Sequence, residues 1–177
     1  TFLSSFGVSA VTRGHANHHV SIHDLRVNGV FSGDCFGAEF RPWRQSRLPF
    51  LICSCAPTDF DPAEARASVR RILDTGARRI YVTHFGELKD PDGGAEALLH
   101  SIDAMEAITD EALARGLEGD ALRAFCEEGI HEACRRQLEF CGAALSGQDL
   151  WSVNEHLRIN AQGLAVFVER RRNPKPE

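Results

Sequence analysis

Hydrophobic and polar residues alternate along the first third of the chain, as they do on half-buried β-strands. The alternation runs through residues 6–12 and again through 20–22, and residues 50–52 form a short apolar run. Asn28-Gly29 is typical of a tight hairpin turn. The hairpin strands predicted on its two sides are residues 25–27 and 30–31. This third of the chain is therefore predicted to form a β-sheet.

A helix with clear end signals follows the predicted sheet. Asp61 is a good N-cap, Pro62 suits the first helical position, and Glu64 completes a capping box. An apolar stripe at helical spacing follows, and Gly76 is expected to end the helix. Residues 79–83 then have the pattern of a strand. A helix that leads into a strand in this way is typical of layered α/β folds.

From Gly93 onward the apolar spacing is helical, and it predicts three helices separated by glycines. The fold class predicted is α/β with a helical C-terminal region. We expect an α/β unit over residues 1–92, a helical extension over 93–170 and a polar tail over 171–177, with the chain end from Arg170 frayed.

Composition narrows the class of protein. The 177 residues carry 20 Lys and Arg against 25 Asp and Glu, a net charge of -5, which argues against nucleic acid as the main partner. No apolar run is long enough to cross a bilayer and no secretion signal is visible, so we expect a cytoplasmic protein without membrane contact. Six cysteines form no C-x-x-C pair and are predicted to be buried thiols, neither disulfides nor zinc ligands. The chain begins at Thr1, so we expect it to be processed or a piece of a longer protein.

Three glycine-containing loops follow predicted strands and carry residues that ligate metals. These loops are T-R-G-H-A-N-H-H from Thr12, F-S-G-D-C-F-G from Phe31 and T-H-F-G from Thr83. Strand ends in α/β folds are where sites assemble, and His and Asp suit zinc, manganese or iron. Glycine lets the backbone bring such side chains close together.

These three segments, in this order, resemble the T-P-G-H, G-D and final histidine segments of the metallo-β-lactamase-fold hydrolases. The segments F-D-P-A-E-A and L-R-I-N-A-Q-G-L-A are similar to a bacterial glyoxalase-II-like branch with a helical C-terminal extension. The resemblance covers nearly the whole chain. It implies that the chain is the second αβ half of an αββα sandwich, followed by the helical region.

The resemblance also implies a set of site residues. His15 matches a ligand of the first metal ion, Asp34 matches the carboxylate that bridges two ions, and His84 matches a ligand of the second. His19 matches a structural histidine near the site, and Arg13 replaces the usual proline, which should alter the stiffness of its loop. The histidines that match no ligand position are His18, His23, His100, His131 and His156.

The activity implied is hydrolysis of a small-molecule ester, thioester or related bond. Two divalent ions, zinc first with iron or manganese as alternatives, lower the pKa of a bound water and polarise the attacked group. Asp34 holds the ions at their spacing and can pass a proton. The substrate cannot be inferred from the sequence, because specificity depends on loops. Phe36, Phe40, Trp43 and Phe85 could line an apolar pocket or belong to the core. Residues 41–44 with Arg47 could meet an anionic substrate or form a solvated loop.

The chain departs from the family in one major respect: the motif H-x-H-x-D-H, which supplies four ligands, is absent. Each ion would have at most two protein ligands here, whereas catalytic zinc takes at least three. We therefore expect the chain alone to bind metal poorly, and to expose a sheet face that the N-terminal half of the fold would cover.

Three hypotheses remain open on this sequence. The chain is part of a dinuclear hydrolase that needs its N-terminal half, or it is a non-catalytic interaction or assembly module. A weaker third hypothesis is a single-metal site that two copies of the chain complete as a homodimer.

Overall fold

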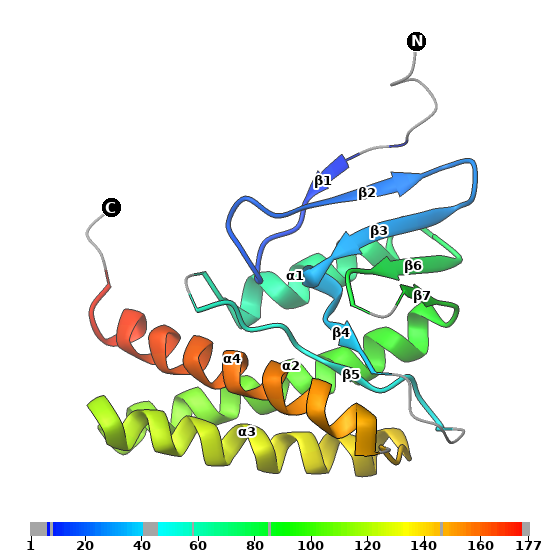
Figure 1. Cartoon of the computed structure of the whole chain (residues 1–177). Coiled ribbons are helices and arrows are strands. Elements are labelled where there is room, and N and C mark those ends of the chain that lie inside the picture. The colour runs from blue at the N-terminus through cyan, green and yellow to red at the C-terminus, as the bar shows by residue number, and fades with distance from the viewer. Residues whose placement is uncertain are drawn as a thin grey trace.

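The computed structural model describes residues 7, 9–40, 46–57, 59–84, 86–145 and 147–174. Figure 1 shows a sheet layer followed by a layer of long helices. The strands are β1 (Ser9–Val11), β2 (Val20–Asp24), β3 (Gly29–Gly33), β4 (Ala38–Glu39), β5 (Leu51–Ile52), β6 (Arg79–Val82) and β7 (Gly86–Leu88). The helices are the 3-10 helix η1 (Asp34–Phe36), α1 (Pro62–Leu73), α2 (Pro91–Ala114), α3 (Gly119–Cys141) and α4 (Gly147–Arg172).

The main sheet has the strand order β1-β2-β3-β6-β7. Its first three strands form an antiparallel meander, whereas β3 and β6 pair in parallel, with a register shift between Phe31 and Gly33. The carboxyl ends of parallel strands meet at the same edge of a sheet. The residues after β3 and after β6, which include Asp34 and His84, therefore lie close together. The predicted α/β class with a helical C-terminal region is confirmed.

The hairpin between β2 and β3 is longer than the sequence predicted. Residues 25–28 form the turn, so the expected strand over 25–27 is wrong. Asp24 is the physical reason: its carboxylate accepts hydrogen bonds from the backbone N–H of Arg26 (2.9 Å) and from its guanidinium (3.0 and 2.7 Å). These bonds curl the backbone one residue after the strand. Asn28 closes the turn with a φ of 46°.

Helix α1 forms where its end signals predicted. Asp61 accepts a hydrogen bond from the backbone N–H of Glu64 (3.0 Å), and Pro62 occupies the first turn. Its buried stripe comprises Pro62, Ala65, Ser68, Val69 and Ile72. The helix ends at Leu73, and a short turn leads to Gly76, which takes a φ of 64°. This helix supports the loop that carries His15.

The three long helices expected after residue 93 are present as α2, α3 and α4, and they pack on one another. The chain end differs from the expectation of a frayed tail from Arg170. Helix α4 continues to Arg172, because Arg170 donates to the Phe60 carbonyl (2.8 Å) and Arg172 to the Leu117 carbonyl (3.0 Å). Within the described part of the chain, no helix is long and apolar enough to cross a membrane.

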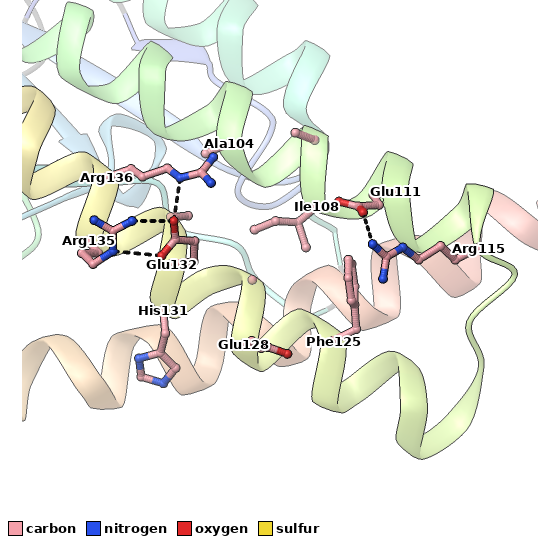
Figure 2. A pocket seen from close by; sticks show the side chains of 13 residues that line it. Ala104, Ile108, Glu111, Arg115, Phe125, Glu128, His131, Glu132, Arg135 and Arg136 are labelled. Carbon is pink, nitrogen blue, oxygen red and sulfur yellow. Dashed lines mark hydrogen bonds and ion pairs between the residues drawn. The ribbon is translucent and has the colours of Figure 1, made fainter.

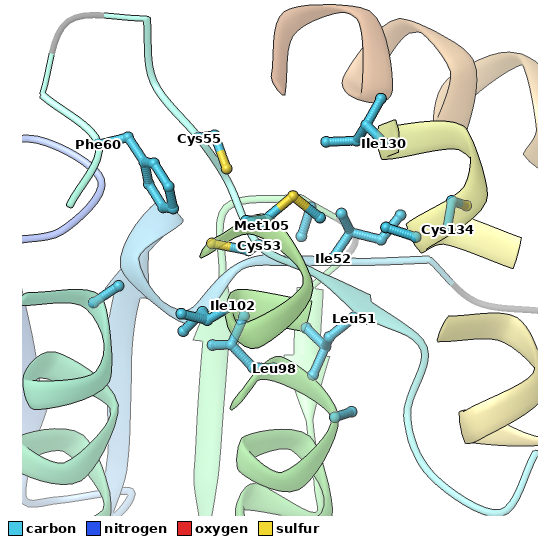
Figure 3. Close-up of a cluster of buried hydrophobic side chains, with 14 of the residues drawn as sticks. Leu51, Ile52, Cys53, Cys55, Phe60, Leu98, Ile102, Met105, Ile130 and Cys134 are labelled. Carbon is cyan, nitrogen blue, oxygen red and sulfur yellow. The ribbon is translucent and has the colours of Figure 1, made fainter. Parts of the chain in front are cut away.

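The core lies between the sheet and the helices and continues among α2, α3 and α4. Figure 3 shows β5 and the residues after it packed beside α2, with Cys53 next to Met105. All six cysteines are buried and unpaired, as predicted: Cys35, Cys53, Cys55, Cys126, Cys134 and Cys141. Burial raises the pKa of Cys126 to about 11, which keeps that thiol protonated and unreactive at neutral pH.

The other face of the sheet is apolar and open. Side chains on β2 and β3 alternate so that Ser21 and Ser32 point inward, while Ile22 and Phe31 point outward. Phe31 stacks on Tyr81 of β6, with ring centroids 4.7 Å apart. The large apolar residues exposed on this face and its turn are Val11, Val20, Ile22, Leu25, Val27 and Phe31. The expected exposure of a sheet face is thus observed.

Candidate functional site

The structure brings together the three side chains predicted to form the site. His15 comes from the loop after β1, Asp34 starts η1 directly after β3, and His84 follows β6. The Nε2 atom of His15 lies 3.6 Å from Asp34 Oδ2, and the Nε2 atom of His84 lies 3.3 Å from Asp34 Oδ1. One carboxylate therefore faces two imidazoles, one with each oxygen.

The loop that carries His15 is held against α1. Gly14 takes a φ of 116°, and a Cβ added to it would lie 2.3 Å from the backbone nitrogen of Ala65. Ser68 of α1 donates to the Arg13 carbonyl (2.6 Å), and the Asp61 N–H donates to the Gly14 carbonyl (3.0 Å). Glycine is required here by both conformation and space. The arginine that stands in place of proline contributes its carbonyl to this attachment.

The hydrogen bond of His15 determines which of its ring nitrogens carries the proton. Its Nδ1 lies 3.0 Å from the carbonyl oxygen of Ser54, and a carbonyl can only accept, so Nδ1 donates. In the neutral ring, Nε2 then presents a lone pair to Asp34 Oδ2. Two acceptors that face each other are stabilised by a proton or a cation between them. Histidines that bind metals have this arrangement, with one nitrogen bound to a backbone oxygen and the other free.

His19 has the supporting position expected for it. Its Nδ1 lies 3.0 Å from Thr12 Oγ1, and its ring centroid is 6.0 Å from that of His15. Its Nε2 lies so close to Gly33 that an added Cβ would be 2.4 Å away. Burial, followed by the charge of His15, lowers the pKa of His19. His19 therefore packs beneath the Gly33-Asp34 turn.

His156 of α4 also lies near these residues, although it matches no ligand position in the resemblance. Its ring centroid is 6.2 Å from that of His84. Its Nε2 is buried and has no hydrogen-bond partner among the described residues. Burial is the main reason that the pKa of His156 falls to about 4, although a hydrogen bond to the Cys53 backbone opposes this shift. The sequence signal for an inward-facing side chain was its position three residues after the apolar Val153, which is buried.

The remaining histidines have no part in this cluster. His23 Nε2 lies 3.0 Å from Asn28 Oδ1 in the β2–β3 turn, and His100 Nδ1 lies 2.6 Å from Gln137 Oε1. His18 is exposed. His131 lines an open groove of about 760 Å³ between α2 and α3. Figure 2 shows side chains that line this groove, among which Glu132 pairs with Arg135 and Arg136. This groove is lined by helices and carries none of the predicted site residues.

The residues considered for substrate contact are only partly described. Phe36 and Phe40 are buried in the core, and Phe40 packs against Phe50 and the ring of His156. Arg47 donates to the Phe140 carbonyl (2.8 Å) and pairs with Glu96, so it joins its loop to α2 and α3. Residues 41–44, which include Trp43, and Phe85 lie outside the described residues.

The spacing of the donor atoms can be compared with that of zinc ligands. Ligands of one zinc ion at bond lengths of 2.0–2.2 Å are separated by about 3.4 Å in a tetrahedral site. The pairs of His15 with Asp34 and of His84 with Asp34 have separations of 3.6 and 3.3 Å. Asp34 Oδ1 is buried and makes no hydrogen bond with a described residue. No group of three or more His, Cys, Asp or Glu in the described ranges could hold an ion by itself.

Comparison with known proteins identifies the fold. No protein-family profile and no curated protein sequence matches the chain. A metallo-β-lactamase superfamily protein from Sulfolobus tokodaii, ST1585, superposes on 88% of this chain and 44% of its own, with 17% identity and a TM-score of 0.50. The metallo-β-lactamase family protein TTHA1429 from Thermus thermophilus covers 93% of this chain and 43% of its own, with 18% identity and a TM-score of 0.49.

The first of these matches shows that the chain has the metallo-β-lactamase type of fold. The chain spans less than half the length of either matched protein.

Proposed function

We propose that this chain is part of a metal-dependent hydrolase of the metallo-β-lactamase type. The observation that carries the proposal is the Asp34 carboxylate, which lies between His15 Nε2 at 3.6 Å and His84 Nε2 at 3.3 Å. His15 and Asp34 would hold one divalent ion, and Asp34 and His84 a second. Asp34 would thus bridge the two.

Each residue has a distinct part in the chemistry. Ions bound at this site would supply an activated water and polarise an ester, thioester or related carbonyl. The Ser54 carbonyl keeps the proton of His15 on Nδ1, so that Nε2 remains available as a ligand. Asp34, with both oxygens directed toward the site, can hold a proton released during hydrolysis. Neutral imidazoles supply nitrogen ligands without adding negative charge.

The partner that we propose is an N-terminal half of the same fold. Catalytic zinc takes at least three protein ligands, and the described residues offer two to each ion. A segment with H-x-H-x-D-H would supply the missing ligands. The exposed apolar face of β2 and β3 gives such a half a surface to pack on. The chain also spans only 44% of the length of ST1585.

The substrate, the metal and the location are proposed from the resemblance, the ligand chemistry and the cysteines. The resemblance to a glyoxalase-II-like branch favours a small-molecule ester or thioester as substrate. Zinc is the metal we propose first, with iron and manganese as alternatives, because His and Asp ligands accept all three. Six unpaired cysteines favour a reducing compartment, which supports a cytoplasmic location.

The test is metal content by elemental analysis, on the 177-residue chain and on the longest protein that its gene encodes. We expect about two ions in a protein that includes H-x-H-x-D-H, and substoichiometric metal in the chain alone. Asp34→Ala should weaken binding by more than the roughly 10–100-fold typical of losing an outer-shell partner, because it removes a ligand of both ions. His15→Ala should reduce binding of one ion.

The matched control is His131→Ala, which removes an imidazole on α3 and should leave the metal content unchanged. Metal that persists in Asp34→Ala, or a complete gene that lacks H-x-H-x-D-H, would overturn the proposal for this protein.

A second candidate is an interaction or assembly module without catalysis. It is favoured by the exposed apolar sheet face and by the incomplete ligand set among the described residues. A protein that binds a partner through this face, and that binds no metal even when complete, would have this function.

A further inference from the structure

Helix α4 is tied to the segment just after β5 by one buried side chain. Asn160 is 1% exposed and uses both ends of its amide. Its Nδ2 donates to the carbonyl of Cys53 (2.6 Å), and its Oδ1 accepts from the N–H of Cys55 (2.9 Å). The amide thus pairs with this segment as a neighbouring strand would.

A second, independent feature brings the same two elements together. Gly163 lies one turn further along α4, and a Cβ added to it would be 2.2 Å from the carbonyl oxygen of Cys55. Only glycine allows this approach of helix to backbone. Figure 3 shows Cys53 and Cys55 on the extended segment that runs between the helices. Both contacts therefore fix residues 53–55 against α4.

The residue between these two contacts, Ser54, is hydrogen-bonded to a residue of the candidate site. Ser54 lies between Cys53 and Cys55, and its carbonyl accepts the hydrogen bond from His15 Nδ1 (3.0 Å). Cys53 is also the backbone partner of His156. A short segment is thus held by α4 and in turn holds one site imidazole from the loop after β1 and one from α4.

We propose that Asn160 is a positioning residue for this site. By fixing Cys53 and Cys55 it holds the Ser54 carbonyl against His15, and so keeps the proton of His15 on Nδ1 and the lone pair of Nε2 toward Asp34. This positioning role rests on the proposed function, because a hydrolase would need His15 held in this way. It would explain why α4 is present beside the site. Its geometry concerns only this chain and needs no bound metal.

The experiment measures the tautomer of His15 in the full 177-residue chain by nitrogen-15 NMR, at alkaline pH where imidazoles are neutral. In the wild-type chain we expect the proton of His15 to reside on Nδ1. In Asn160→Ala we expect the two ring-nitrogen signals of His15 to move toward the average of both tautomers. Asn160→Asp should change them in the same direction, because a carboxylate cannot donate to Cys53.

Two controls separate positioning from general loss of stability. Asn154→Ala removes an exposed amide from the same helix and should leave the signals unchanged. Val168→Ala opens a small cavity at a fully buried α4 position, away from residues 53–55, and should lower stability without changing the His15 tautomer. Asn160→Asp keeps the side-chain size and decides the question if Asn160→Ala does not fold.

The proposal is overturned if His15 of the wild-type chain does not carry its proton on Nδ1, if both Asn160 variants keep the wild-type signals, or if Val168→Ala shifts them equally. The proposed function is tested separately by metal content. Absence of metal from the protein that includes H-x-H-x-D-H, together with a shifted tautomer in the Asn160 variants, would overturn the hydrolase and retain the positioning role.

Discussion

Asp24 is a single residue whose charge determines the shape of a turn. It is 4% exposed, and the side-chain hydrogen bond from Arg26 is the first reason that its pKa falls from 3.8 to about 2. An acid with a lowered pKa in the folded state stabilises the fold above its ordinary pKa. This stabilisation is complete above pH 3.8 and is lost as the pH falls toward about 2.

We expect Asp24→Asn to lower the urea midpoint at neutral pH and to remove this part of the acid dependence. The difference between wild-type and variant midpoints should be constant at neutral pH and should shrink between pH 3.8 and about 2. A difference that stays the same down to pH 2 would show that the Asp24 charge does not stabilise the turn.

The residues at the candidate site fall into two groups. Some stand in a local sequence motif, and others are placed there only by contacts between distant parts of the chain. His15, Asp34 and His84 each follow a strand and stand in a recognisable local segment, so their grouping could be predicted. His156 could not be placed in this way, because its distance from His84 depends on how α4 folds back over residues 53–55. The tautomer of His15 depends on Ser54, 39 positions away, and no local pattern contains that contact.

At the scale of elements, the attachment of the His15 loop to α1 can be tested at Gly14. Gly14→Ala should destabilise the chain for two reasons, the φ of 116° and the contact of the new Cβ with the Ala65 backbone at 2.3 Å. Gly116→Ala is the matched control, because Gly116 has a φ of 65° and nothing within 4 Å of an added Cβ. The control should cost about 1 kcal/mol from conformation alone.

Gly14→Ala should cost clearly more than this control, since the backbone of α1 or of the loop must also move. Urea unfolding of both variants measures the difference. Equal losses of unfolding free energy in the two variants would indicate that the loop moves away from α1 at no cost. This would contradict the view that α1 holds His15 in place.

An element could be predicted from the sequence where the residues that determine its ends lie within it or next to it. The start of helix α1 was predicted to the residue, because its N-cap and its proline are local, whereas the helix ends at Leu73, before the glycine expected to end it. The β2–β3 turn was misjudged, because the Asp24–Arg26 pair competes with the Asn28-Gly29 signal. The end of α4 was also misjudged: Arg170 and Arg172 read as a solvated tail, but they bond to carbonyls of Phe60 and Leu117 that only the folded chain brings near.

At the scale of the whole molecule, the layers of the fold are unequally covered. Figure 1 shows the long helices on one side of the sheet. The inward face of β2 and β3 carries Ser21, Ser32 and the buried Val30, while Ile22 and Phe31 on the outward face are 40% and 48% exposed. In a sheet with one solvated face, the outward positions are usually polar. A surface of this kind is typical of one that another layer covers.

We therefore expect the chain, in the absence of a partner layer, to associate with itself through this face. Ile22→Thr combined with Phe31→Thr should weaken association by about 2 kcal/mol, from about 1 kcal/mol for each half-exposed side chain. That is a factor of about 30 in the dissociation constant, measurable by sedimentation equilibrium. Trp151→Thr is the control, because Trp151 is 73% exposed on α4 and lies outside the sheet. The chain could instead be monomeric at every concentration, or Trp151→Thr could weaken association as much as the double variant does. Either result would show that the sheet face does not mediate self-association. The proposal of a covering N-terminal half would then rest on the incomplete metal ligands and on the 44% of ST1585 that the chain spans.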